Sequence, residues 1–179
     1  MFVLIVGAGR VGSAVAKRAL AAGHEVSVLD EDPLSHERLE DSDGQTWEDA
    51  GGLFTVGRAL EVDSLVEAGV QGADVFIAST DGDNTNLTVA QIVQRRFSVD
   101  KVVCRVMDPA RAAWYAEQGL HTISPTRHAI EMFEQALGCL LYTSVSSAFM
   151  DTLPPVGLAG RRQKLPGFVV VTRTAIRAR

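Results

Sequence analysis

The chain has 179 residues, which is enough for one large hydrophobic core and too few for two complete α/β domains. It is 46% hydrophobic and 22% charged, as in ordinary globular proteins. Its net charge of -5 argues against a general nucleic-acid-binding protein, because neutralising phosphates needs an excess of Lys and Arg. No apolar run is long enough for a membrane span, and the N-terminus lacks signal-peptide features, so a cytoplasmic protein is expected.

Short apolar runs alternate with longer amphipathic stretches, which is typical of buried parallel strands connected by helices. The expected strands are residues 2–6, 25–29, 53–56, 74–78, 101–106 and 121–124. The expected helices are residues 11–22, 33–39, 62–68, 83–97, 109–118 and 126–142. The second of these is the beginning of a helix that the polar residues 41–44 interrupt. Right-handed crossovers then predict a Rossmann-type α/β fold with a doubly wound parallel six-stranded sheet of order 3-2-1-4-5-6.

The charge changes sharply near the C-terminus. Residues 1–150 contain 11 basic and 21 acidic residues, whereas residues 151–179 contain 6 basic residues and 1 acidic residue. We expect residues 1–142 to form the Rossmann domain and residues 143–179 to form a linker and an irregular basic tail with one strand-like run at 168–172. The two cysteines, Cys104 and Cys139, lack the spacing of metal ligands, and Cys104 is expected to be a small buried thiol.

The first loop carries the sequence Gly7-Ala8-Gly9-Arg10-Val11-Gly12, which matches G-x-G-x-x-G. It follows the first strand directly and opens the first helix, as the phosphate-binding fingerprint does. Gly7 allows the tight turn, Gly9 lets a pyrophosphate approach the backbone, and Gly12 lets helix and strand pack closely. The free N–H groups of the helix then attract phosphate, so this loop is expected to bind an adenine nucleotide.

Two charged residues refine this prediction. Asp30, at the end of the second strand, is placed to accept hydrogen bonds from ribose hydroxyls, and it would repel a 2′-phosphate. NAD(H) is therefore favoured over NADP(H), and ADP or ATP fits equally well. Arg10 lies inside the loop, where it either contacts phosphate or is a solvated arginine at the helix start.

Five further stretches give a resemblance to a known family. They are LVEAGV at 65–70, ADVFIAST at 73–80, DNTNL at 83–87, RVMDP at 105–109 and ISPT at 123–126. In order and spacing they resemble the nucleotide-binding regulatory domains of potassium channels and Trk/Ktr-type potassium transporters, the RCK or KTN family. The resemblance covers roughly residues 1–140.

The resemblance implies a regulatory subunit, not an enzyme, at the inner face of a membrane. Such domains form dimers and larger rings, in some cases with a paralogous subunit, beneath a membrane potassium channel or transporter, and they respond to NAD(H), ATP or ADP. It implies that Ser79 and Thr80 lie beside the ligand and that Arg105 faces phosphates of the same or a neighbouring subunit. An ion pair of Arg105 with Asp108 is the alternative. Asn86 is interpreted as a cap or first-turn residue of its helix in preference to a ligand contact.

Two features depart from the family pattern. After the third strand the family has Gly-Asp followed by a small residue, with the aspartate near the adenine, whereas this chain has Arg58 between Gly57 and Ala59. Arg58 therefore supports an alternative in which the chain is a nucleotide-binding-deficient subunit that completes a ring. The family also continues into a C-terminal domain, of which residues 165–173 resemble only a piece.

The last helix and the fold class leave two further questions. Ile130, Phe133, Leu137 and Leu140 or Leu141 recur at helical spacing, so this apolar stripe packs either on its own sheet or on a second subunit. An NAD-dependent oxidoreductase is the rival class, because hydride-transfer enzymes use the same fingerprint. None of the four histidines belongs to a cluster typical of catalytic machinery, and no nucleophile or metal motif is present, so a non-enzyme is favoured.

Overall fold

The computed structural model of the chain describes residues 1–40 and 45–150, and for residues 139–150 only the helical backbone is considered. The chain divides into two compact units, Met1–Leu137 and Gly138–Arg179. The basic tail and its strand-like run at 168–172 lie outside the described residues. Within the described ranges, no helix has the length and apolar character needed to cross a membrane.

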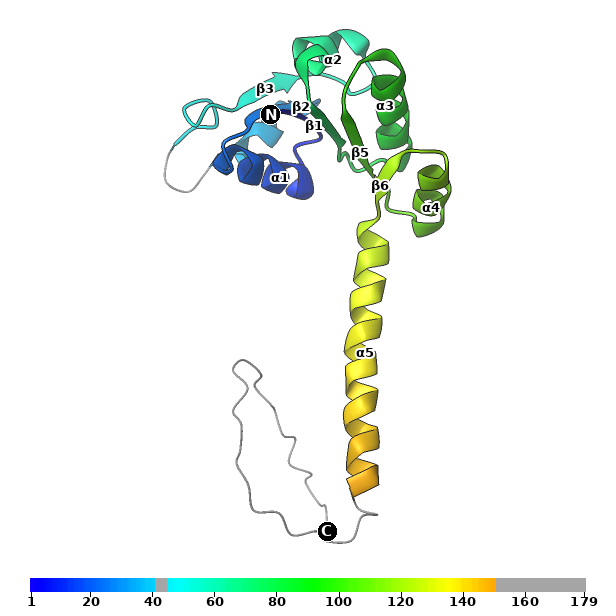
Figure 1. The fold of residues 1–179 in the computed structure, drawn as a ribbon. Helices are drawn as coiled ribbons and strands as arrows, with labels where there is room; N and C mark the ends of the chain where they lie inside the picture. The colour runs from blue at the N-terminus through cyan, green and yellow to red at the C-terminus, as the bar shows by residue number, and fades with distance from the viewer. Residues whose placement is uncertain (41–44, 151–179) are drawn as a thin grey trace. The chain divides into compact units, whose positions relative to one another are not determined.

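A single parallel sheet organises the first unit (Figure 1). Its six strands follow the order β3-β2-β1-β4-β5-β6, which confirms the predicted Rossmann topology. The central strand pairs Val3 with Val26 of β2 on one side and with Val75 of β4 on the other. The strands are β1 (Phe2–Val6), β2 (Glu25–Asp30), β3 (Leu53–Val56), β4 (Val75–Ala78), β5 (Lys101–Arg105) and β6 (His121–Ile123).

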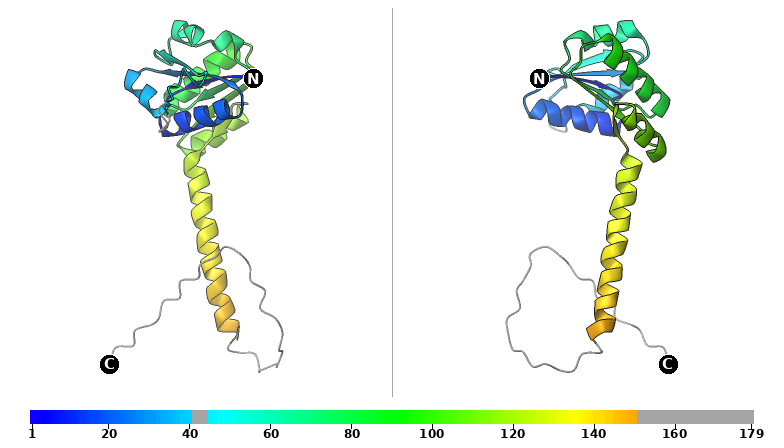
Figure 2. Two further views of the ribbon diagram at one scale, coloured as in Figure 1. Left: turned by 90° about the vertical axis from the view of Figure 1, so that its left-hand side faces the viewer. Right: turned by 45° about the vertical axis from the view of Figure 1, so that its right-hand side comes forward.

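Helices cover the two faces of this sheet, as the two views of Figure 2 show. The helical segments are α1 (Arg10–Ala21), the 3-10 helix η1 (Pro33–Arg38), α2 (Val62–Glu67), the 3-10 helix η2 (Val70–Gly72), α3 (Asp83–Arg96), α4 (Pro109–Glu117) and α5 (Pro125–Met150). Alternate residues of β1 face opposite cores: Leu4 packs in the cluster with Leu65 of α2 and Val89 of α3, whereas Ile5 packs in the cluster with Ala16 of α1. The strands β1, β2 and β5 contain runs of consecutive buried residues, which is why they are continuous apolar runs in the sequence.

The observed bounds agree with the predicted ones to within one residue for all elements except the last helix. Several ends have an evident local cause. Gly23, Gly69 and Gly119 follow α1, α2 and α4 with φ of 82°, 92° and 87°, a left-handed conformation that only glycine adopts without strain. Asp108 begins α4 by accepting hydrogen bonds from the N–H groups of Ala110 and Arg111.

Two predictions need correction. Residues 33–39 were expected to begin an ordinary helix, but Pro33–Arg38 is a 3-10 helix. The second correction concerns α5, which continues to Met150 instead of ending at Tyr142. Its one internal glycine, Gly138, is tolerated, and no proline interrupts the helix before Met150.

Trp47 is 2% exposed, covers the sheet beside it and donates its indole N–H to the carbonyl of Leu53 at 3.0 Å.

Candidate functional site

An open cleft of about 960 Å³ lies at the carboxyl ends of the strands, where open α/β sheets bind their ligands. Two residues of the predicted site, Ala8 and Gly12, are buried beneath the cleft and do not line it. The other nine do line it, and the structure thus brings together Gly7, Gly9, Arg10, Val11, Asp30, Arg58, Ser79, Thr80 and Arg105.

The three glycines of the first loop have different surroundings. Gly7 has φ of +97°, and a Cβ there would lie 2.7 Å from the backbone nitrogen of Thr80. A Cβ on Gly12 would lie 1.8 Å from the carbonyl oxygen of Gly7. Gly9, by contrast, has ordinary extended backbone with φ of -69°, and a Cβ there would meet nothing within 4 Å. Packing of the protein therefore requires glycine at Gly7 and Gly12, whereas the space beside Gly9 is open to a ligand.

Asp30 is held at the tip of β2 by the backbone. Its carboxylate accepts hydrogen bonds from the N–H groups of Ala8 at 2.6 Å and of Asp32 at 2.9 Å. Its own carbonyl oxygen accepts the N–H of Gly57, which follows β3. Since each carboxylate oxygen has a second lone pair, Asp30 keeps the capacity to accept a ribose hydroxyl. The N–H of Ala8 is engaged by Asp30 and is not directed to phosphate.

Two arginines at the cleft have no acidic partner in the described part of the chain. Arg10 is exposed at the first position of α1 and lines the cleft. Arg38, at the end of η1, lines the same cleft and was not among the site residues predicted from the sequence. No ion pair or side-chain hydrogen bond holds either guanidinium among residues 1–40 and 45–150. Both are therefore available to an anionic ligand.

Arg58 lies at the rim of the cleft with its side chain 72% exposed. Its guanidinium forms ion pairs with Glu31 at 3.6 Å and with Glu61 at 3.8 Å. Both carboxylates are themselves exposed, and such surface pairs contribute little to stability. The arginine that departs from the family pattern is thus held loosely by two acids and does not fill the cleft.

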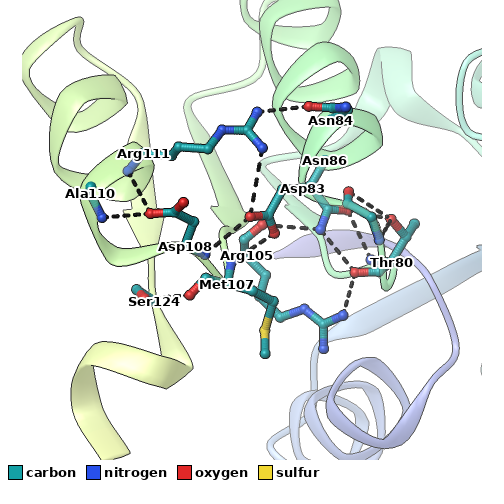
Figure 3. Close-up of polar contacts among 11 residues, drawn as sticks. Thr80, Asp83, Asn84, Asn86, Arg105, Met107, Asp108, Ala110, Arg111 and Ser124 are labelled. Atoms are coloured by element: carbon teal, nitrogen blue, oxygen red, sulfur yellow. Dashed lines mark hydrogen bonds and ion pairs between the residues drawn. The ribbon is translucent and has the colours of Figure 1, made fainter. Parts of the chain in front are cut away.

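The opposite end of the cleft is closely hydrogen-bonded (Figure 3). Ser79 is buried and donates its hydroxyl to the carbonyl of Gly7 at 3.2 Å. Asn86, which is 0% exposed, forms three hydrogen bonds with Thr80. The amide oxygen of Asn86 accepts the N–H and the hydroxyl of Thr80 at 2.9 and 2.7 Å, and its amide nitrogen donates to the carbonyl of Thr80 at 2.9 Å. The hydroxyls of Ser79 and Thr80 are therefore both engaged within the protein.

Arg105 is at the end of β5, beside this cluster. One of its terminal nitrogens donates a hydrogen bond to the carbonyl of Thr80, and its Nε is buried without a hydrogen-bond partner. Among the described residues no ion pair joins Arg105 to Asp108, whose carboxylate instead caps α4. Asp83 lies next to the same loop and accepts the N–H groups of Met107 at 2.7 Å and Asp108 at 3.1 Å.

The thiol of Cys104 lies directly before Arg105 in β5. Burial, and to a smaller extent the negative charge of Asp83, raises the pKa of the Cys104 thiol to about 11. The side chain is 1% exposed, as expected from its apolar run. Cys104 is therefore a neutral packing residue at physiological pH and does not act as a nucleophile.

Asn86 has a larger role than the sequence analysis gave it. It does lie in the first turn of α3, but Gly82 is the residue at the cap position. Its second amide hydrogen bond reaches the carbonyl of Arg105 at 3.0 Å, so it connects the ends of two neighbouring strands. No local sequence pattern indicates these contacts, because they join the ends of two strands that are far apart in the chain.

The sheet order and the tightly packed glycine-rich loop after β1 define a Rossmann-type domain. The family model of the TrkA-N domain matches residues 3–125. The chain therefore belongs to the TrkA-N domain family, and the resemblance to the Trk/Ktr (RCK or KTN) family is confirmed.

Two curated relatives support the same assignment. The Trk system potassium uptake protein TrkA of Streptomyces coelicolor is 36% identical over 159 residues, which cover 89% of this chain and 67% of that protein. A TrkA homologue of Methanothermobacter thermautotrophicus is 32% identical over 139 residues, which cover 76% of this chain and 60% of that protein. The chain thus spans about two thirds of the length of these relatives.

Solved structures share the fold. The TrkA-N domain of the inner membrane protein ybaL from Escherichia coli has a TM-score of 0.64 at 18% identity, covering 76% of this chain and 96% of that one. The Kef CTD of Shewanella denitrificans, solved in an AMP-bound form, has a TM-score of 0.62 at 23% identity, covering 84% and 92%. The RCK domain of GsuK has a TM-score of 0.60 at 21% identity, covering 84% of this chain and 30% of that one.

Proposed function

We propose that the cleft binds an adenine nucleotide, NAD(H) in the first place and ADP or ATP as alternatives. The observation that carries this proposal is the open space beside Gly9, with Arg10 unpaired next to it in the described part of the chain. Backbone N–H groups at a helix start and an uncompensated guanidinium favour a phosphate at this position. Asp30 is placed one strand further along the sheet edge to accept the ribose hydroxyls.

The bound nucleotide would regulate a potassium-uptake system. The relatives from Streptomyces coelicolor and Methanothermobacter thermautotrophicus are named Trk system potassium uptake proteins, which supports a regulatory role in potassium transport for this chain. The domain would act at the inner face of the membrane on a separate channel or transporter subunit. A nucleotide that binds one conformation of the assembly more tightly shifts its population, and a difference of about 1–3 kcal/mol changes the ratio of conformations about 5- to 150-fold.

Self-association belongs to the same proposal. Ile130, Phe133 and Leu137 of α5 are 47%, 72% and 59% exposed, so these members of the apolar stripe do not pack on the sheet of their own domain. An exposed apolar stripe of this kind favours association with a second subunit as a dimer or a larger ring. Residues 1–142 would form the nucleotide-binding domain. Because α5 continues to Met150, the linker and the piece of a C-terminal domain expected in residues 143–179 would begin beyond this helix.

Two alternatives are weaker. The first alternative, suggested by Arg58, is a ring-completing subunit that does not bind nucleotide. The Arg58 side chain, however, forms ion pairs with Glu31 and Glu61 at the rim and leaves the cleft open. An NAD-dependent oxidoreductase most often uses a histidine as the acid–base residue beside the nicotinamide, and none of the four histidines lines the cleft. The relatives named above are likewise not named as enzymes.

The regulatory role is tested in cells that lack this chain. Potassium uptake is measured after complementation with the wild-type chain or with Gly9→Ala, whose added methyl group occupies the space proposed for phosphate. Wild type is expected to restore uptake that responds to the cellular nucleotide supply, and Gly9→Ala to restore uptake without that response. Unchanged uptake in the deletion strain under every nucleotide condition would contradict the proposed function.

A further inference from the structure

The side chain of Asn86 uses its full hydrogen-bonding capacity on two strand ends (Figure 3). Its oxygen accepts two hydrogen bonds from Thr80, and its nitrogen donates one to the carbonyl of Thr80 and one to the carbonyl of Arg105. An amide offers two acceptor and two donor positions, so all four are occupied. None is spent on the α3 backbone, although Asn86 belongs to that helix.

We call the end of the cleft that is lined by Gly7, Gly9, Ser79, Thr80 and Arg105 the phosphate end. The hydrogen bonds of Asn86 fix two of these residues. Thr80 and Arg105 both line the cleft, and they lie at the carboxyl ends of the neighbouring strands β4 and β5. The guanidinium of Arg105 also donates to the carbonyl of Thr80 that Asn86 holds. Asn86 therefore holds both the backbone from which the arginine extends and the carbonyl on which its guanidinium rests.

We infer that Asn86 is a positioning residue for phosphate binding, acting through Thr80 and Arg105 without touching the ligand. This inference rests on the proposed nucleotide binding. Asn86 is 0% exposed and does not line the cleft, so its effect passes through its two partners. The buried Nε of Arg105, which has no hydrogen-bond partner, indicates a guanidinium that the protein itself does not satisfy. An anionic phosphate beside it would supply the missing compensation.

Positioning gives an expectation that a purely structural role does not. Loss of the Asn86 amide lets Thr80 and Arg105 adopt several arrangements, and ligand phosphates must then order them on binding. The adenosine part of the ligand lies toward Asp30, which Asn86 does not contact. Binding of a ligand with phosphates should therefore weaken much more than binding of adenosine alone.

The test uses the full chain with Asn86→Ala and a matched control, Asn84→Ala. Asn84 is an exposed residue two positions earlier in the same helix, and its side chain accepts a hydrogen bond from Arg111 at 2.7 Å. Affinities for NAD and for adenosine are measured by calorimetry and ligand-observed NMR, at a temperature where circular dichroism shows each variant folded. Asn86→Ala is expected to weaken NAD binding about tenfold or more and adenosine binding less than twofold. Asn84→Ala is expected to change neither.

Each other outcome decides a different claim. If Asn86→Ala weakens both ligands equally, or neither, the positioning role is wrong while nucleotide binding stands. If the wild-type chain binds neither ligand, the proposed function is wrong and the positioning role with it. Should Asn86→Ala fail to fold, Asn86→Ser keeps a small polar group at this position, and the same selective loss of NAD affinity is expected of it.

Discussion

The two ends of the cleft are built differently. At the phosphate end, Ser79 and Asn86 are buried and hydrogen-bonded to the loop and strand ends around them. At the other end, the ion pairs of Arg58 with Glu31 and Glu61 are long and exposed to solvent.

This difference indicates where recognition is fixed and where it can vary. Residues that are held by buried hydrogen bonds are ordered before the ligand arrives, so the protein loses little conformational entropy when the ligand binds. Exposed ion pairs are weak and screened by salt, so they rearrange readily around different ligands. We therefore expect the phosphate end to provide the affinity for nucleotides in general. The rim near Arg58 is expected to determine which nucleotide is preferred.

The largest expected effect comes from filling the tight side of the loop. In Gly12→Ala the new Cβ would lie 1.8 Å from the carbonyl oxygen of Gly7 and 2.7 Å from the hydroxyl of Ser79, so the loop and β4 must shift. Overpacking of this severity costs about 3 kcal/mol, or a fall in Tm of roughly 6–12 °C, measured by calorimetry. A Gly12→Ala variant that melts within 2 °C of wild type, on the order of 1 kcal/mol or less, would show that the loop is not tightly packed.

The next effect concerns Cys104, which is buried in the hydrophobic core directly before Arg105. Burial raises the pKa of the Cys104 thiol from its ordinary value of 9.0 to about 11 in the folded chain, so the unfolded chain releases this proton first as pH rises. Stability is thus unaffected below pH 9 and is lost progressively between pH 9 and 11, at about 1.4 kcal/mol per pH unit at most. Denaturant unfolding of wild type and Cys104→Ala across this range isolates the thiol from other groups. Parallel pH profiles for the two chains would mean that the site is hydrated.

A third effect separates binding from stability. Gly9→Ala adds a methyl group where the protein has nothing within 4 Å, on a backbone that alanine adopts readily. We expect its free energy of unfolding to change by less than about 1 kcal/mol, since only the cap position of α1 is altered. Its affinity for NAD is expected to fall about tenfold or more, on the order of 1.4 kcal/mol, measured by calorimetry. Unchanged affinity would place the phosphates elsewhere.

The smallest effect is expected at the rim. Arg58→Ala removes two exposed ion pairs and should change stability by less than about 0.5 kcal/mol. Its affinity for NAD should change by no more than about threefold, because Arg58 is not part of the ordered phosphate end. Chemical denaturation and calorimetry measure both quantities. A loss of affinity as large as that of Gly9→Ala would show that the two ends of the cleft do not differ as described.

The sequence predicts most of the fold and the lining of the cleft, because both depend on local signals. Strand runs, the glycine fingerprint and Asp30 follow each other at spacings that a Rossmann crossover requires. The role of Asn86 depends on the juxtaposition of two strands that are separated in sequence, and no local pattern reveals it. Trp47 was missed for a similar reason: it covers the sheet from an irregular segment that has no helical periodicity.

The account is tested most directly by the melting temperature of the full chain with NAD, NADH, NADPH, ADP and ATP. A ligand that binds only the folded chain, at a hundredfold excess over its Kd, stabilises it by about 2.7 kcal/mol. For a chain of this length, that corresponds to a rise in Tm of roughly 5–11 °C. The account predicts such a rise with NAD(H), ADP or ATP, and its absence in Gly9→Ala. No rise with any of the five nucleotides would contradict the central claim.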